Sequence, residues 1–467
     1  MSRSAVDVSQ HSSFAALSGD FNPLHMDAAQ SRRSQFGGQV VHGIHLVFLA
    51  LSEIPRSRAG FIKHLQVQFR SAILLDEPFE IQVIDRGHDH YELRVTDGLQ
   101  PNLFMTLEVG DGLDEARFHR SDPRRTIRVE THELEHLLGL EGVEPLFLDT
   151  EIWTHMFPGA ATWMSVYDAA RLLATTRVVG MRAPGQWSIF RQLTLQKRST
   201  STINKPTDSV SYRVSNLDLR FGLATVSMES SDLQMVAEVL VREPPPEQQP
   251  LSYVEKRVPK GHFQGMRALV IGGSRGLGNL TSKILVAGGA EVLFTYNVGR
   301  SESELLLEEL GPSSISMQLS IGAISASQER SIRRFSPHLL AYFATPPITR
   351  QPPGTWNGRV FWAFSEVYLG GLSQVLDLLS HSNDFVSLLI PSTSFVESRP
   401  PGFSEYCSAK RAMEIMCTDW QQVNPHRRVS APRLPPLLTD QTASRTTKFE
   451  ADNLSILLPY LLELTKT

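Results

Sequence analysis

Cysteine is nearly absent from this chain of 467 residues, which contains only two. Both of them, Cys407 and Cys417, fall in one segment that predicts a single helix, so they cannot join separate elements of the fold. A small secreted domain built on disulfides is therefore excluded. The two thiols are predicted to be buried and unbonded.

Long apolar runs are also missing. The sequence has no stretch of about 18 apolar residues, which is the length that crosses a bilayer. Its first seven residues, MSRSAVD, lack the apolar core of a signal peptide. We therefore expect a cytoplasmic protein without a membrane partner.

An excess of charge of one sign is absent as well. The chain has 45 Lys and Arg against 49 Asp and Glu, a net charge of −4, and no basic stripe with interleaved aromatics. This composition argues against nucleic acid as a partner. The length exceeds that of one compact core and predicts about three modules.

Two glycine-containing segments near the N-terminus form the first candidate site. The segment Ser18–His25, SGDFNPLH, places Asp20 and His25 five residues apart in a turn stiffened by proline. The segment Phe36–Gly43, FGGQVVHG, then opens an apolar helix expected over about residues 40–52. An acid and an imidazole beside a helix N-terminus suit the addition or removal of water across a carbon–carbon double bond. One group moves the proton on carbon, the other handles the hydroxyl, and helix N–H groups stabilise enolate charge.

These segments resemble the signature of the MaoC-like, or hydratase 2, family of (R)-specific enoyl-thioester hydratases and dehydratases. The resemblance implies a hotdog fold, in which an antiparallel sheet wraps a helix, with Asp20 and His25 as the catalytic dyad. His42 and His45 stand three apart on the following helix and could suggest a metal site together with His25. No cysteine or second carboxylate joins them at a ligand spacing, so we predict no metal.

Residues 129–243 look like a weaker copy of residues 1–128. A Phe-Pro-Gly segment opens an apolar helix expected over about residues 157–179, and strands of period two follow. In this register Trp163 takes the place of His42, and no acid and imidazole motif precedes the helix. The prediction is an α+β double hotdog whose second half lacks the dyad but completes the fold and helps to shape the acyl pocket.

A proline- and glutamine-rich stretch interrupts these patterns, so residues 244–264 are predicted to be a semi-rigid linker. Residues 265–467 begin with an apolar strand that leads into GGSRGLG and a helix. This combination forms a site for a dinucleotide pyrophosphate, because glycine allows backbone and phosphate to approach closely. The segment resembles the TGxxxGxG motif of short-chain dehydrogenases/reductases, with Ile271 in place of the threonine.

The tyrosine and lysine of YCSAK, Tyr406 and Lys410, resemble the YxxxK pair of the same family. The resemblance implies an α/β Rossmann-type doubly wound parallel sheet. It also implies that Tyr406 moves the substrate proton during hydride transfer while Lys410 lowers the phenol pKa and holds the nicotinamide ribose. The third catalytic group is a hydroxyl about thirteen residues before the tyrosine. Counting back gives Thr393, with Ser392 and Ser394 as neighbouring alternatives.

The expected cofactor is NADP(H). The strand that ends near Asn297 lacks the carboxylate that selects NAD, and Arg275 and Arg300 could reach a 2′-phosphate. The residues expected to bind the dinucleotide are Gly272, Ser274, Arg275, Gly276, Leu277, Gly278, Asn297 and Arg300.

Three positions depart from the pattern of these reductases. Tyr368 stands where an asparagine is often found in the central helix, Phe343–Pro346 replaces an Asn-Asn-Ala-Gly turn, and Ser320 replaces an acid near the adenine. The tail after Lys410 is also short. These departures bear on whether the domain catalyses reduction.

The two chemistries share an intermediate, the 3-hydroxyacyl thioester, and fusion raises its local concentration. We interpret the chain as a bifunctional 3-ketoacyl-thioester reductase and (R)-3-hydroxyacyl-thioester dehydratase of fatty-acid-like or polyketide-like biosynthesis. Its substrate would be carried by acyl carrier protein or coenzyme A, and a homodimer is one assembly open to it. Two alternatives remain. One is a hydratase whose reductase-like domain only binds NADP(H) or docks, and the other is a hydratase/3-hydroxyacyl dehydrogenase working in the β-oxidation direction.

Overall fold

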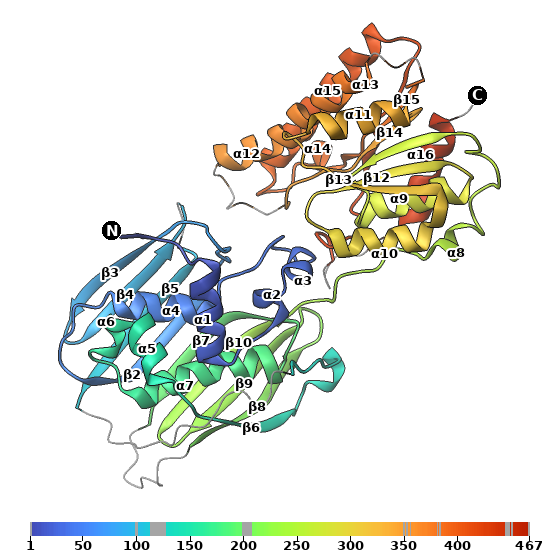
Figure 1. Cartoon of the computed structure of the whole chain (residues 1–467). Helices are drawn as coiled ribbons and strands as arrows, with labels where there is room; N and C mark the ends of the chain where they lie inside the picture. The colour runs from blue at the N-terminus through green and yellow to red at the C-terminus, as the bar shows by residue number, and fades with distance from the viewer. Residues whose placement is uncertain are drawn as a thin grey trace. The chain divides into compact units, whose positions relative to one another are not determined.

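The chain divides into two compact units in a computed structural model (Figure 1). Unit 1 is Met1–Pro244, and unit 2 is Pro245–Ala443 with Thr447–Thr467. The structure describes residues 2–98, 101–112, 128–198, 208–348, 351, 354, 356–380, 382, 384–443, 449 and 452–465.

Unit 1 contains an antiparallel sheet with ten strands among its described residues, in the order β1-β3-β4-β5-β2-β7-β10-β9-β8-β6. The strands are β1 (Ser2–Ser4), β2 (Gly60–Phe69), β3 (Phe79–Gly87), β4 (His90–Thr96), β5 (Leu103–Asp111), β6 (Glu141–Pro145), β7 (Ser188–Lys197), β8 (Ser209–Asp218), β9 (Leu223–Ser230) and β10 (Leu233–Val241).

The strand order shows that unit 1 consists of two halves with the same topology. From the edge to the centre, the first half reads first, third, fourth, fifth and second strand, and the second half repeats this order from its own edge. The second strands of the two halves, β2 and β7, pair antiparallel at the centre, with His64 opposite Gln196. A single sheet therefore spans both halves.

One long buried helix belongs to each half, α4 (Gly43–Ser52) in the first and α7 (Val166–Arg177) in the second. Strand β10 buries every second residue, from Leu233 to Val241, because successive side chains of a strand point to opposite faces. Helices and buried strand residues share one hydrophobic core. The other helices are α1 (Val8–Ser18), α2 (Pro23–Met26), α3 (Ala28–Arg32), α5 (Thr150–Met156), α6 (Pro158–Ala161), the 3-10 turn Leu134–His136 and the π-helical turn Val178–Arg182.

The predicted helix limits in unit 1 need correction. Helix α4 begins at Gly43 rather than near residue 40, and the predicted helix 157–179 is broken into α6 and α7. The N-cap of α4 is His42, and the N-cap of α7 is Ser165. Ser165, and not Trp163, therefore occupies the position that corresponds to His42. Its hydroxyl accepts the first-turn N–H of Asp168, which is the role that serine commonly has at an N-cap.

Unit 2 contains a parallel sheet of six strands among its described residues, in the order β13-β12-β11-β14-β15-β17. Counted along the chain this order is 3-2-1-4-5-6, the order of the Rossmann fold. The strands are β11 (Arg267–Ile271), β12 (Glu291–Tyr296), β13 (Ser314–Gln318), β14 (Leu339–Tyr342), β15 (Ser387–Leu389) and β17 (Arg428–Ser430), and a separate parallel pair joins β16 (Ser392–Thr393) to β18 (Arg433–Leu434).

Helices cover both faces of this sheet. Ala268 and Val270 of β11 pack in one hydrophobic core with α9, α10 and α16, and Leu269 and Ile271 pack in another with α11, α13 and α15. A strand buried on both faces needs a continuous apolar run, which is why β11 shows no polar alternation. The helices are α8 (Leu251–Val254), α9 (Gly276–Ala287), α10 (Arg300–Leu310), α11 (Ala326–Phe335), α12 (Gly358–Ser365), α13 (Leu372–Leu379), α14 (Phe395–Ser398), α15 (Ser404–Val423), α16 (Asn453–Leu464), the 3-10 turn Gly311–Ser313 and the π-helical turn Glu366–Gly371.

Across the described part of the chain, every helix is too short or too polar to span a membrane.

Candidate active sites

Helix α1 ends immediately before the first candidate acid. Gly19 is its C-cap and adopts a left-handed conformation, with φ of 71°, which a residue with a Cβ rarely adopts. Asp20 follows, and Asn22 then caps the short helix α2, where its side chain accepts the N–H of Leu24. Pro23 at the first position of α2 fixes the backbone further. The loop is thereby fixed on both sides of the acid.

The Asp20 side chain is buried and hydrogen bonded at both oxygens. Its Oδ1 accepts the backbone N–H of Asn22 at 3.1 Å, and its Oδ2 accepts the hydroxyl of Thr176 at 2.6 Å. Thr176 belongs to α7, in the half of unit 1 that lacks the motif. The same half also fixes the loop that carries Asp20, because the side-chain amide of Asn22 donates to the carbonyl of Gly180 at 2.7 Å.

The two ring nitrogens of His25 have different roles. Its Nδ1 lies 2.7 Å from the carbonyl oxygen of Val40, so Nδ1 carries the proton and Nε2 is left as an acceptor. The His25 carbonyl in turn accepts the side chains of His11 and Gln39, at 2.9 and 2.8 Å. These contacts hold the imidazole in one orientation and one tautomer.

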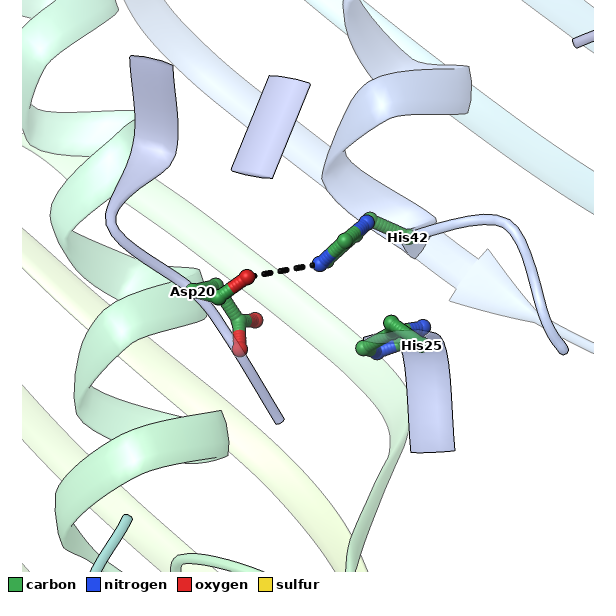
Figure 2. Close-up of side chains that lie close together, drawn as sticks. All are labelled: Asp20, His25 and His42. Atoms are coloured by element: carbon green, nitrogen blue, oxygen red, sulfur yellow. Dashed lines mark hydrogen bonds between the residues drawn. The ribbon is translucent and has the colours of Figure 1, made fainter. Parts of the chain in front are cut away.

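His42 connects the two members of the dyad (Figure 2). Its Nε2 donates to the backbone carbonyl of Asp20 at 3.0 Å, and its ring stacks on His25 with the centroids 3.9 Å apart. His42 is fully buried at the N-cap of α4. It thus fixes the backbone of the acid and one face of the imidazole.

Burial changes the protonation of the dyad. It raises the pKa of Asp20 and lowers the pKa of His25, in each case as the largest cause. The opposite charge of the partner counteracts both effects, since His25 lowers the pKa of Asp20 and Asp20 raises that of His25. Groups coupled in this way titrate as a pair, with two dissociation steps that belong to both residues. Between these two steps, Asp20 and His25 together hold one titratable proton.

A cavity of about 240 Å³ opens beside the dyad. Asp20, His25 and Gly43 lie on its wall, and Gly43 is the first residue of α4, where backbone N–H groups have no partner within the helix. Most of the remaining wall is apolar and comes from both halves of unit 1, including Leu24, Val40, Phe69, Val179, Phe190 and Leu240.

Asp20, His25 and His42 also place ligand atoms within 4.8 Å of one another, as a metal site requires. His25 Nδ1 and His42 Nε2 are both bound to carbonyl oxygens, so each imidazole offers only its other nitrogen, and the Asp20 carboxylate accepts two protein donors. This hydrogen-bonding pattern fits proton transfer, and the expectation of a site without metal stays a prediction.

The glycine-rich turn of unit 2 has the shape expected of a pyrophosphate site. A Cβ at Gly278 would lie 2.2 Å from the carbonyl oxygen of Gly272, and one at Gly272 would lie 3.0 Å from the backbone nitrogen of Ala344. A Cβ at Gly276, at the N-terminus of α9, would meet open space instead. The turn is therefore packed on one side and open on the other, and it fits a dinucleotide.

The other predicted cofactor residues surround this turn. Ser274 is buried within it, and Leu277 lies in the first turn of α9. Arg275 forms an ion pair with Asp440 at 3.7 Å, whereas Arg300 is exposed and pairs with Glu304 of its own helix at 2.8 Å. Asn297 is exposed just after β12.

The structure separates the three hydroxyls proposed as partners of the tyrosine. Tyr406 is hydrogen bonded to the Thr393 side chain, which lowers its pKa against the larger effect of burial. Ser392 instead donates to Glu414 Oε1 at 2.5 Å, within a network that Arg433 completes. Thr393, rather than Ser392, is therefore the hydroxyl that faces Tyr406.

Burial is the largest influence on the pKa of both Tyr406 and Lys410, and the lowering of the phenol pKa by Lys410 stays a prediction. Burial raises the pKa of Tyr406 to about 12 and lowers the pKa of Lys410 to about 7. The Lys410 ammonium donates to the carbonyl of Pro391 at 2.8 Å and lies 4.0 Å from the centre of the Tyr368 ring. Tyr368 is fully buried, and its hydroxyl lies 2.5 Å from that of Thr345.

Sequence reasoning missed Thr176, Gly180 and His11, all of which contact the motif of unit 1. A sequence signal for the first two is lacking, because they lie more than 150 residues from Asp20 in a segment without a motif.

Comparison with known families identifies the N-terminal segment. Residues 2–82 match the family model described as MaoC like domain, a range that includes Asp20, His25 and His42. This match confirms the resemblance stated for the N-terminus. A comparison with curated proteins finds no match to the chain.

Solved structures similar to the chain include short-chain dehydrogenases and an oxidoreductase. The oxidoreductase yciK from Escherichia coli is 17% identical, with a TM-score of 0.39, and the match covers 44% of this chain and 92% of that one. A short chain dehydrogenase from Shigella flexneri 2a complexed with NADP is 16% identical (TM-score 0.40), and one from Escherichia coli CFT073 complexed with NADPH is 17% identical (TM-score 0.40). Each of these two matches covers 45% of this chain and 94% of the other.

Proposed function

We propose that unit 1 is a double hotdog that hydrates trans-2-enoyl thioesters and dehydrates (R)-3-hydroxyacyl thioesters. The observation that carries the proposal is the Asp20 and His25 pair on the wall of a largely apolar cavity, with the pKa of the acid raised and that of the base lowered. Pairs of groups whose environments move their pKa values in opposite directions are typical of acid–base sites. The repeated strand order of the two halves supports the double hotdog.

Dehydration requires one proton to leave C2 of the substrate and another to reach the departing hydroxyl. The open Nε2 of His25 is suited to accept the first proton, and protonated Asp20 is suited to supply the second. Transfer from the His25 imidazolium to the Asp20 carboxylate then restores the starting state, so the protons balance. The first-turn N–H of Gly43 is suited to stabilise charge on the thioester oxygen.

The cavity also supports a thioester substrate with an anionic carrier. Its interior is mostly apolar, as an acyl chain requires, and two exposed arginines, Arg70 and Arg191, are among its lining residues. Acyl carrier protein and coenzyme A both present a phosphate on the arm that bears the thioester, so both remain proposed carriers.

For unit 2 we propose NADP(H)-dependent reduction of 3-ketoacyl thioesters, which makes the chain bifunctional in a biosynthetic pathway of the fatty-acid or polyketide kind. Gly272, Gly276 and Gly278 would hold the pyrophosphate, and the cofactor would supply the hydride. Tyr406 would donate the proton to the substrate oxygen, with Thr393 positioning the tyrosine hydroxyl.

A second candidate function for unit 2 is binding of the dinucleotide without turnover. The observation that favours it is the contact of the Lys410 ammonium with Pro391 and with the ring of Tyr368. In this arrangement one N–H of the ammonium is already bound to Pro391, and burial lowers the pKa of Lys410 to about 7, which reduces the positive charge that would activate Tyr406 at neutral pH. The β-oxidation direction, hydration followed by oxidation, uses the same residues. Metabolic flux determines the direction in which the two reactions run.

Incubating the full chain with a 3-ketoacyl thioester and NADPH, and in a separate reaction with an (R)-3-hydroxyacyl thioester, and following the products by mass spectrometry, tests both units. Formation of the enoyl thioester supports the bifunctional proposal. If a 3-hydroxyacyl thioester is interconverted with the enoyl thioester but the ketone persists while NADPH binds, the second candidate is correct. If neither thioester is converted, the proposed function of unit 1 is wrong.

A further inference from the structure

The half of unit 1 that lacks a dyad supplies one of the hydrogen bonds to the catalytic acid. The Thr176 hydroxyl, on the last turn of α7, donates to Asp20 Oδ2 at 2.6 Å. Thr176 is 3% exposed and Asp20 is 1% exposed, so the two groups that form this hydrogen bond are both buried. A hydrogen bond to a buried carboxylate is stronger than one between neutral groups.

The next turn of the same segment makes room for the carboxylate. Gly180 lies in the π-helical turn Val178–Arg182, and a Cβ at this position would lie 2.7 Å from both carboxylate oxygens of Asp20. Its carbonyl also accepts the Asn22 amide. The carboxylate is thus packed against a position where any other side chain would displace it.

A third residue of this segment fixes the backbone before the acid. The buried guanidinium of Arg177 donates to the carbonyl of Ser18 at 2.7 Å and to Glu144 at 2.9 Å. Glu144 lies in β6, so the chain just before Asp20 is tied to a strand of the second half.

The end of α4, the long helix of the first half, makes a corresponding contact with the second half, but an acid takes no part in it. Ser52, the last residue of α4, accepts the backbone N–H of Ala160 at 3.3 Å, and a Cβ at Gly159 would lie 2.0 Å from the Ser52 carbonyl oxygen. Each long helix therefore ends against a segment of the other half, α7 against the loop of Asp20 and α4 against the short helix α6. Only the end of α7 meets an ionisable side chain there.

We propose that Thr176 and Gly180 are positioning residues for Asp20, so that the motif-bearing half is catalytically incomplete without the second half. The proposal rests on the hydratase function proposed for unit 1. Thr176 holds the carboxylate in the orientation that faces His25, and Gly180 provides the space for it. The second half is thereby part of the acid–base site as well as of the acyl pocket.

The test uses the full chain, a trans-2-enoyl-CoA substrate and the variants Thr176→Val, Thr176→Ser and Thr175→Val. Thr175 is a matched control, because it is equally buried but bonds the carbonyl of Leu172 instead of Asp20. We expect Thr176→Val to lower kcat about tenfold or more, the effect of one hydrogen bond to a charged group, with little change in KM. Thr176→Ser should restore the rate.

The pH profile separates positioning from a general loss of structure. The hydrogen bond from Thr176 lowers the pKa of Asp20. Its removal should therefore move the bell-shaped profile to higher pH. Thr175→Val should leave the profile in place. If Thr176→Val retains wild-type kcat and profile while Asp20→Asn is inactive, the positioning role is wrong and the hydratase proposal stands.

Gly180→Ala provides an independent variant, and Gly370→Ala is its control. Gly370 also lies in a π-helical turn, in unit 2, where a Cβ would meet open space. Gly180→Ala should reduce kcat at least tenfold by displacing the carboxylate, and Gly370→Ala should not affect hydration. Equal hydration by the two variants would overturn the role of Gly180. If the wild type itself does not hydrate the substrate, the proposed function fails. The carboxyl ¹³C titration of Asp20 in the wild type and in Thr176→Val then decides the positioning role without activity.

Discussion

The two candidate sites differ in what surrounds the groups of each motif. In unit 1, Asp20 and His25 belong to separate turns, but each is oriented by hydrogen bonds and they remain side by side at a cavity. In unit 2, Tyr406 and Lys410 lie one turn apart on α15, yet the tyrosine contacts Thr393 and the lysine turns to Pro391. Motif spacing thus determines where the backbone places two groups, whereas the neighbouring residues determine the protonation of each group.

Burial is the largest cause of the pKa changes at both sites, but its consequence differs. In unit 1 it favours the neutral forms of an acid and a base, which lets a single proton be shared between them. In unit 2 burial favours the neutral phenol of Tyr406, and it reduces the fraction of Lys410 that is protonated at neutral pH. The same physical effect therefore supports proton transfer in one unit and opposes the expected activation in the other.

The largest expected effect concerns the dyad of unit 1. Asp20→Asn and His25→Ala should each reduce hydration of a trans-2-enoyl thioester at least about a hundredfold, because a general acid or base is lost. Reduction of a 3-ketoacyl thioester by unit 2 should not change. Steady-state kinetics with both substrates would measure this, and circular dichroism would show whether the fold is intact. A folded variant with a near-wild-type rate would place the chemistry elsewhere.

The sequence could predict that Asp20 and His25 lie together because the constraints on them are local. Gly19, Asn22 and Pro23 act on the backbone within a few residues of Asp20, so the turn can be predicted from the residues themselves. The order of periods, a helix followed by alternating strands, likewise predicted the plan of unit 1. The limits of the second long helix were wrong, because the interruption between α6 and α7 leaves the apolar pattern unbroken.

The remaining features depend on contacts distant in sequence. No pattern near Asp20 indicates that Thr176 would reach its carboxylate, and the chemistry of a buried threonine is usually structural. Tyr368 could be recognised as unusual for its position, but the direction of the Lys410 ammonium depends on how the Tyr368 ring packs beneath it. Such features require the structure.

The second prediction tests the tyrosine of unit 2. Tyr406→Phe should lower reduction of a 3-ketoacyl thioester about a hundredfold, because it removes the proton donor, and should leave hydration unaffected. NADPH oxidation measured at 340 nm, alongside the hydration assay, checks both. Ser392→Ala is the matched comparison, since Ser392 bonds Glu414 rather than the tyrosine. A Tyr406→Phe variant that still reduced the ketone would remove the reductase assignment from this residue.

A tenfold effect is expected for cofactor choice. NADPH should bind at least about tenfold more tightly than NADH, because the guanidinium of Arg275 can bond a 2′-phosphate. Arg275→Ala should erase most of this preference. Arg300→Ala should change it less, because the Arg300 side chain is 79% exposed and that of Arg275 is 40% exposed. Fluorescence titrations with each cofactor measure the ratios, and equal affinities in the wild type would contradict the assignment.

The smallest expected effect is a pH-dependent change in stability caused by Lys410. Folding lowers its pKa from 10.5 to about 7, so between these values the unfolded chain binds the proton more readily than the folded one. The contribution of Lys410 to stability is therefore least favourable below about pH 7 and improves as the pH rises towards 10. Lys410→Met, which cannot be charged, should have its highest melting temperature relative to wild type near pH 6. The difference should diminish by pH 9 to about 10. Thermal unfolding of both full-length proteins across this range isolates Lys410, because every other titrating group is common to the two. A constant difference would show that the lysine is fully charged in the folded state, and unit 2 would then resemble unit 1 in keeping its predicted pair ready for catalysis.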